Sequence, residues 1–281
     1  MAIITSELFM AGHERRHRMK VFCHIVLIIT LALCEVLGQS PSAGQSKDPL
    51  KVAPNAYKME FENDWVRVMR VHYGPRVKIR EHYHTERPAA YVYLSDSGPV
   101  IFKHVDLPYG AITRPALKAG TFRLYHAVKE VHAVENTTDV PSDFLRVEFK
   151  TQPVNQNSLR GKFPRETVAP GENLRKVQFE NEQIVIERLV IAPKKSMDVS
   201  TNDSQPALVI ALTASAPLTS PEISSIGGKR TDTLGKLDPG KTIWIAQGQQ
   251  RQFENSSDAA IELLRFGFKT KPFNDPTDRT R

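Results

Sequence analysis

The sequence predicts an all-β protein made of two tandem copies of one small barrel domain. Two observations support this prediction: short strand-like segments alternate with turn signals, and one set of residues recurs later in the chain in the same order. With 281 residues the chain has room for one or two domains, since domains usually contain about 100–200 residues. The 19 prolines outnumber the 15 glycines, which favours short strands joined by turns.

Strand-like segments fill the region from residue 57 to residue 152. Apolar and polar side chains alternate in residues 66–71, 91–94 and 144–149, and turn signals such as Gly74-Pro75 lie between these segments. Strands at this spacing, without a helical period, indicate an all-β barrel or sandwich.

An internal repeat predicts the domain organisation. Phe61-Glu62-Asn63 recurs as Phe179-Glu180-Asn181, an offset of 118 positions, and the same offset aligns Tyr91–Leu94 with Val209–Leu212. Chance matches of three residues are common, but matches held in register over about 90 residues are not. We therefore predict a linker at 39–56, a first barrel at 57–152, a second linker at 153–172, a second barrel at 173–272 and a tail at 273–281.

The N-terminal segment has the layout of a signal peptide. Lys20 precedes an apolar run from Val21 to Leu33, and Val36-Leu37-Gly38 resembles a cleavage site. We expect residues 1–38 to be removed and the protein to be exported, to a periplasm or outside the cell. An uncleaved membrane anchor is the alternative, and both lipidation at Cys34 and a true start at Met19 stay open. Cleavage would remove both cysteines of the chain and with them any thiol chemistry.

The composition excludes several functions. The net charge of +7 is dispersed along the chain, so it does not indicate a nucleic-acid partner. The sequence contains neither a Gly-x-Ser-x-Gly nucleophile motif nor a phosphate-binding loop. We expect a small-molecule ligand and no membrane contact beyond the N-terminal segment, and a homo-oligomer stays open.

Histidines are confined to the first repeat once the N-terminal segment is set aside. On a strand, His82 and His84 would point to the same face, with Tyr83 on the other. Two imidazoles on one face can clamp a transition metal, and His132, from a later strand, is the natural third ligand. The six histidines after residue 38 are His72, His82, His84, His104, His126 and His132.

These residues resemble the two motifs of the cupin superfamily. The first resemblance is Gly74-x7-His82-x-His84, and the second is a strand opening at Gly120 or Thr121 that leads to His132 and Asn136. The likeness is to small single-barrel cupins, here duplicated, and it covers about 200 residues. It implies double-stranded β-helix (jelly-roll) barrels and a divalent transition metal, Fe, Mn, Zn, Ni or Cu, held by His82, His84 and His132.

The sequence also departs from the family pattern. Pro88 or Ala89 stands where the family has a carboxylate ligand, and Glu86 is the nearest acid. The Pro and Gly of the second motif are replaced by Ala127 and Lys129. Three histidines alone can still hold Zn or Fe and leave positions open for water or a ligand.

Further residues are assigned from strand parity. We expect His126 to be a fourth metal ligand, a hydrogen-bond donor to one, or an acid/base group. Tyr91, Tyr93 and Arg80, with Lys78, are expected to line the pocket, whereas His72 and His104 are interpreted as structural or surface residues.

The second copy has lost the metal ligands. The positions equivalent to His82, His84 and His132 hold Ser200, Asn202 and Arg251. We expect this barrel to support the first by covering a strand edge or apolar face, with anion binding at Arg251 as the alternative.

For function the sequence favours a metal-dependent dioxygenase or isomerase acting on a small polar or anionic molecule. A non-catalytic ligand- or metal-binding module and a structural protein with vestigial histidines are the alternatives.

Overall fold

The computed structural model describes residues 47–105, 107–108, 110–126, 128, 130–169, 171–200, 205–213, 217–224 and 228–273. The predicted signal peptide or anchor at 1–38 lies outside these residues, as do Asn202, Ala127 and Lys129. Within the described part, no helix has the length and apolar character needed to cross a membrane.

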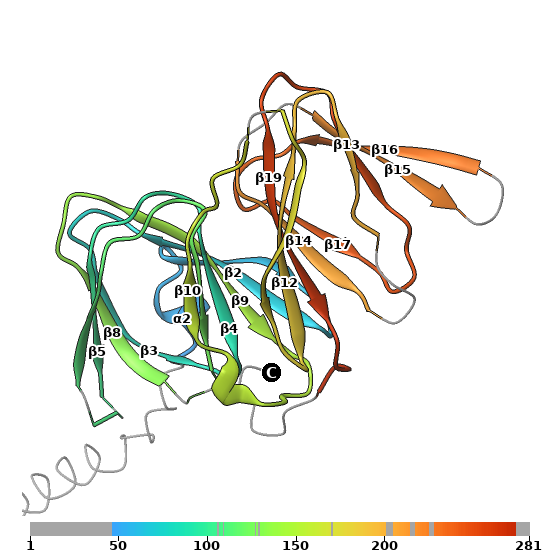
Figure 1. The fold of residues 1–281 in the computed structure, drawn as a ribbon. Helices are drawn as coiled ribbons and strands as arrows, with labels where there is room; N and C mark the ends of the chain where they lie inside the picture. Colours follow the sequence, from blue (N-terminus) through green and yellow to red (C-terminus); the bar gives the residue numbers. More distant parts are fainter. Residues whose placement is uncertain are drawn as a thin grey trace, which may run out of the picture. The chain divides into compact units, whose positions relative to one another are not determined.

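The first barrel is formed by strands β1 to β10 in two antiparallel sheets (Figure 1). One sheet has the order β1-β2-β9-β4-β7-β10, and the other has the order β3-β8-β5-β6. The strands are β1 (Tyr57–Glu62), β2 (Val66–Tyr73), β3 (Lys78–His84), β4 (Ala89–Tyr93), β5 (Val100–His104), β6 (Ala111–Arg114), β7 (Phe122–Tyr125), β8 (Glu130–Asn136), β9 (Ser142–Phe149) and β10 (Gly161–Phe163).

The second barrel is formed by strands β11 to β19, again in two antiparallel sheets (Figure 1). Their orders are β11-β12-β19-β14-β17 and β13-β18-β15-β16. The strands are β11 (Leu174–Glu180), β12 (Ile184–Ile191), β13 (Ser196–Asp198), β14 (Ala207–Ala211), β15 (Pro217–Ser224), β16 (Gly228–Lys236), β17 (Thr242–Ile245), β18 (Gln252–Asn255) and β19 (Ile261–Phe268).

Both barrels have the same strand pairing. Counted in chain order from β2 or from β12, eight strands pair as first-eighth-third-sixth in one sheet and second-seventh-fourth-fifth in the other. This is the order of a double-sheet jelly roll, in which most paired strands lie far apart in the sequence. The predicted fold class, two tandem jelly-roll barrels of cupin type, is confirmed.

The residues that revealed the repeat have structural roles that recur in both barrels. Asn63 Oδ1 accepts hydrogen bonds from the backbone N–H groups of Trp65 and Val66, and Asn181 Oδ1 accepts the equivalent pair from Gln183 and Ile184. Such Asx turns start a strand by satisfying backbone donors that the sheet leaves unpaired. The matching tripeptides therefore encode one turn used twice.

The two barrels share one apolar core, and both lie in the compact unit from Lys47 to Arg281. One face of the β2 sheet contributes side chains such as Val68 and Phe149, and the β12 sheet contributes Ile186 and Phe268. Because these sheets are buried on both faces, strands such as β14 are continuous apolar runs. The second barrel thus covers an apolar face of the first, as the sequence favoured.

Two segments predicted as linkers hold more structure than a linker would. Residues 153–172 include β10, which pairs with β7, and Phe163 of β10 stacks on Phe122 with ring centroids 4.6 Å apart. Residues 39–56 include the short helix α2 (Pro49–Val52), capped by the Asp48 carboxylate on the Leu50 N–H. Apolar packing and a helix cap therefore order segments that lack sequence periodicity, and the domain boundaries themselves stay predictions.

Candidate metal centre

Strands β3 and β8 bring the three predicted ligands together on the inner face of the first barrel. His82 lies directly opposite His132 in the strand register, and His84 follows on the same face. All three are buried, and their ring centroids are 4.9 Å (82–84), 4.7 Å (82–132) and 5.0 Å (84–132) apart. Each offers a nitrogen within 4.8 Å of the other two. The three histidines predicted from sequence are therefore neighbours in space.

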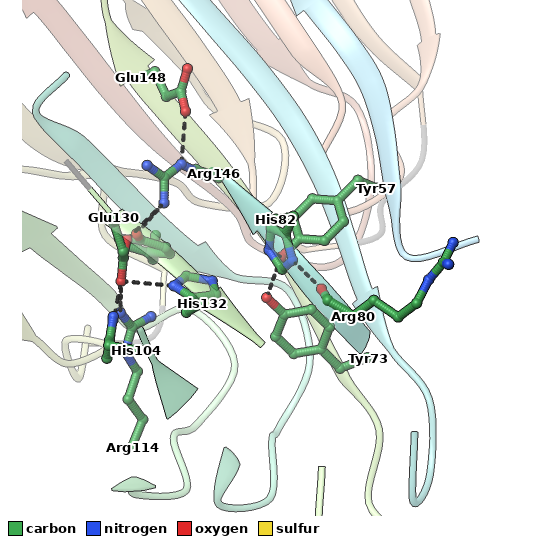
Figure 2. A network of polar contacts seen from close by, with 11 residues as sticks. Tyr57, Tyr73, Arg80, His82, His104, Arg114, Glu130, His132, Arg146 and Glu148 are labelled. Atoms are coloured by element: carbon green, nitrogen blue, oxygen red, sulfur yellow. Dashed lines mark hydrogen bonds and ion pairs between the residues drawn. The ribbon is translucent and has the colours of Figure 1, made fainter. Parts of the chain in front are cut away.

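A bulge in β3 explains this placement and corrects one expectation. The pairing of β3 with β8 shifts between Ile79 and His82, so both side chains face the interior although they are three residues apart. Arg80 therefore loses the parity it was expected to share with the histidines, and its side chain is exposed and directed away from His82 (Figure 2). Arg80 does not line the site, and its contribution is a backbone carbonyl.

Hydrogen bonds define the tautomer of His82. Its Nδ1 lies 2.8 Å from the Arg80 carbonyl oxygen, which can only accept, so Nδ1 carries the proton. Nε2 is then an acceptor, and the Tyr57 hydroxyl donates to it over 2.8 Å. Tyr57 in turn accepts from the Tyr73 hydroxyl at 2.7 Å. The lone pair of His82 Nε2 therefore faces the barrel interior.

Glu130 orients His132 in the same sense. Glu130 lies opposite His84 in the register and on the same strand and face as His132, and its Oε1 is 3.0 Å from His132 Nδ1. A carboxylate at Nδ1 favours the proton there and leaves Nε2 free to bind a metal. His84 Nδ1 and both ring nitrogens of His132 are buried and make no hydrogen bond within the described part of the chain.

The protonation states suit metal binding. Burial, together with neighbouring His132, lowers the pKa of His82 to about 3. Burial likewise lowers the pKa of His84 and of His132. Burial raises the pKa of Glu130, but the His132 contact and the two arginines nearby outweigh it, so the carboxyl is ionised at neutral pH. Three neutral imidazoles and one carboxylate are the form in which these groups ligate metals or orient ligands.

Two arginines balance the charge of Glu130 inside the barrel (Figure 2). Arg146 Nη1 is 3.9 Å and Arg114 Nη2 is 3.8 Å from the Glu130 carboxylate. Arg146 also donates to Glu148 at 2.8 Å and to the Tyr91 hydroxyl. Arg114 lies over the Phe102 ring, with Cζ 3.9 Å from the ring centroid. These contacts compensate the cost of burying the charges.

The space beside the histidines is small. Tyr57, Tyr91 and Arg146 line a cavity of about 10 Å³ together with His84 and His132. This volume holds about one water molecule. Tyr91 lines this cavity, whereas Tyr93 lines an adjacent cavity that none of the three histidines reaches.

Several other predicted site residues lie elsewhere. Glu86 is exposed, in the turn after β3, and joins no group of metal-binding side chains in the described part of the chain. His126 is only half-buried, stacks on Tyr125 with centroids 5.4 Å apart, and is outside the histidine cluster. His72 is exposed and pairs with Asp143, in line with the surface role expected.

His104 and Glu130 are the residues that sequence reasoning missed. His104 lies opposite His132 on β5 and is buried, so of its two expected roles, structural or surface, the surface role was wrong. Its Nε2 is 3.7 Å from Glu130 Oε1, and His104, Glu130 and His132 form a second group that could hold a metal. The alternation Glu130-x-His132, which puts a carboxylate beside the third ligand, was a signal available in the sequence.

A divalent transition metal fits this donor set. The fit rests on the unsatisfied buried nitrogens of His84 and His132, the fixed tautomer of His82 and the carboxylate behind His132. In the second barrel, Ser200 and Arg251 are half-buried and bond each other through the Ser200 hydroxyl and the Arg251 N–H. Among the described residues, groups that could hold a metal occur only in the first barrel.

Known proteins add support for the fold. No family model and no curated protein matches the chain. Among solved structures, AerE from Microcystis aeruginosa is similar with a TM-score of 0.51 at 12% identity, over 76% of this chain and 97% of that one. A cupin 2 conserved barrel domain protein from Leptotrichia buccalis (0.46, 9%, 76% and 88%) and an oxalate decarboxylase from Lactobacillus farciminis (0.49, 12%, 77% and 81%) are further matches. At 12% identity, the likeness to AerE concerns the fold alone.

Proposed function

We propose that the first barrel holds a divalent transition metal at His82, His84 and His132 and uses it on a small polar or anionic molecule. The observation that carries this proposal is the convergence of three neutral, buried imidazoles in one barrel, two of which, His84 and His132, have unsatisfied nitrogens. A dioxygenase or an isomerase is the reaction class this site favours. When bound, the metal would supply Lewis acidity or redox chemistry at positions the histidines leave open.

The chain's own groups prepare the site. The Arg80 carbonyl holds the Nδ1 proton of His82, and the Glu130 carboxylate, 3.0 Å from His132 Nδ1, favours a proton there, so that both histidines present Nε2. Tyr57 and Tyr73 place a chain of hydroxyls beside His82 that can deliver or remove a proton. Arg146 also lines the cavity, where an anionic group would meet its positive charge although the side chain is already paired with Glu130 and Glu148.

The test of the catalytic proposal is activity after reconstitution. Full-length protein loaded with Fe(II), Mn(II) or Zn(II) is assayed for oxygen consumption and for product formation with small acids, diketones and thiols. We expect turnover that His82→Ala abolishes and that Glu130→Gln lowers by about 10–100-fold through a weaker metal site. Turnover that His82→Ala leaves unchanged would contradict the proposal.

A non-catalytic metal- or ligand-binding module is the second candidate. The small cavity favours it, because a space for about one water leaves little room for a substrate beside the metal. Tight metal binding without turnover across the panel would support this module. Absence of metal binding would leave a structural protein with vestigial histidines.

Export is part of the proposal and is supported by the sequence of residues 1–38 alone. N-terminal sequencing of the protein recovered from outside the cytoplasm should begin near Gln39. Recovery of an intact N-terminus in the membrane fraction would support the anchor instead. A homo-oligomer stays a prediction that sedimentation of the purified protein can test.

A further inference from the structure

A second, larger pocket opens at the seam between the two sheets of the first barrel. Its volume is about 780 Å³, within the range of small-molecule sites. The pocket lies between β6 and the pair β7–β10, where jelly-roll closure leaves two strand edges unpaired. Leu107, Ile112, Leu117 and Val128 give it apolar walls. We call it the seam pocket.

The polar side chains of the seam pocket are basic. Arg123, Arg160 and Lys162 line it together with His126, and the described lining includes no carboxylate. None of the three cations forms an ion pair with another described residue, whereas the arginines of the metal centre are paired. His126 Nδ1 is buried and makes no hydrogen bond to the described protein. Among the described residues, nothing pairs with this positive charge or with His126 Nδ1.

The strand register places two of these cations side by side, Lys162 exposed and Arg123 half-buried. Lys162 of β10 lies directly opposite Arg123 of β7, so the two cations share one face at cross-strand distance. Like charges directly opposite each other on paired strands destabilise a sheet. A protein under selection for stability alone would not need this pair, but an anion between the two side chains would turn repulsion into attraction.

The same register connects the seam pocket with the metal centre. Across the inner face of the sheet, Arg123 lies opposite Tyr91, and Tyr91 lies opposite Arg146. Tyr125, which lines the seam pocket, meets Tyr91 edge to face with centroids 6.4 Å apart. One layer of aromatic side chains therefore separates the two spaces.

We propose that the seam pocket binds a small carboxylic acid with an apolar body, its carboxylate between Arg123 and Lys162 and its hydrocarbon against Leu107, Ile112 and Leu117. Arg160 adds a third cation at the rim. The charge complementarity selects an anion, and the apolar walls select against small inorganic ions. The seam pocket needs no metal, so its binding of a carboxylic acid is independent of metal binding at the histidines.

Calorimetric titration of the full-length, chelator-treated protein with octanoate tests this site, with octanamide as the uncharged match. We expect octanoate to bind at least about tenfold more tightly than octanamide, and this preference to fall with added salt. The double variant R123Q/K162Q should lose the preference, whereas the control Lys58→Gln, which removes an exposed cation from β1, should keep it. His132→Ala should also bind octanoate normally.

Thermal unfolding without ligand separates binding from a structural role. Because the paired cations repel, R123Q/K162Q should unfold at the same temperature as the wild type or higher, and octanoate should no longer raise it. Equal binding of octanoate and octanamide, or unchanged octanoate binding by the double variant, would overturn the proposal. So would a lower unfolding temperature of the ligand-free double variant.

Discussion

The interiors of the two barrels differ far more than their folds. The first is lined by tyrosines, histidines and several buried ionic groups, whereas the second is lined mostly by aliphatic side chains such as Leu189, Val209 and Ile243 and holds a buried ion pair. Tyr91 and Val209 occupy the same register, each opposite an arginine on the next strand, Arg146 or Arg265. The pairing scheme thus persists while the lining has changed. The turns and the shared core hold the fold, which leaves the inner faces free to diverge.

The strongest expected effect concerns the aliphatic interior of the second barrel. Phe253 is fully buried in that core, so Phe253→Ala should lower the free energy of unfolding by about 3–5 kcal/mol. Chemical denaturation measures the loss, and metal content should not change. A loss below about 1 kcal/mol would show that this interior is not a packed core.

The ion pair of the second barrel is formed by Glu187 and two arginines. Glu187 Oε2 accepts from Arg265 at 2.7 Å, and Arg175 donates to Oε1 at 2.8 Å. Glu187→Gln should cost about 3 kcal/mol, because Arg265 keeps its buried charge without a partner. Denaturation at pH 7 tests this cost.

The same ion pair predicts a pH dependence. Burial raises the pKa of Glu187, but Arg175 and Arg265 outweigh it and hold the pKa below its usual range. The folded state therefore binds this proton less readily than the unfolded chain. The contribution of ionised Glu187 to the free energy of unfolding is fully present above the ordinary carboxyl pKa of about 4.3. It is lost as the pH falls through the lower pKa of the folded state. Between pH 7 and pH 3, the unfolding temperature of Glu187→Gln should fall less than that of the wild type. Equal falls for the two proteins would contradict this pH dependence.

Metal removal should affect the first barrel only. Because a metal binds the folded site, free metal at 100 times its dissociation constant stabilises the chain by about 2.7 kcal/mol. Chelation should lower the unfolding temperature of the wild type, and His84→Ala should abolish this response. A response that persists in His84→Ala would place the metal elsewhere.

The smallest expected effect concerns Tyr57. Tyr57→Phe removes the hydrogen bonds to His82 and Tyr73 and should cost about 1 kcal/mol. It also frees His82 Nε2 from a competing donor, so metal affinity should stay equal or rise. Weaker metal binding by this variant in a chelator competition would show that the Tyr57 hydroxyl supports the metal rather than competing with it.

Much of the fold could be predicted because it has local signatures. Alternation marks the strands, and the repeated Phe-Glu-Asn turn marks the duplication, since Asn63 and Asn181 satisfy equivalent backbone donors. The segment around Phe163 could not be predicted, because β10 forms through a long-range stack on Phe122. Pairing partners that are distant in sequence leave no local periodicity.

The candidate site was predicted only in part, because some of its residues meet through local strand geometry and others only through long-range pairing. His82 and His84 share a face over two residues, which strand geometry alone dictates. The bulge that turns Arg80 outward depends on pairing with β8, and Glu130 and His104 reach His132 only through the strand register. The alternation of side chains along one strand does not predict contacts that depend on how that strand pairs with others.

Metal content per chain tests the asymmetry of the two barrels most directly. Elemental analysis compares the wild type with His132→Ala and with Arg251→Ala, the equivalent position of the second barrel. We expect about one metal ion per chain in the wild type and in Arg251→Ala, and almost none in His132→Ala. Metal retained by His132→Ala, or lost from Arg251→Ala, would contradict a metal centre confined to the first barrel.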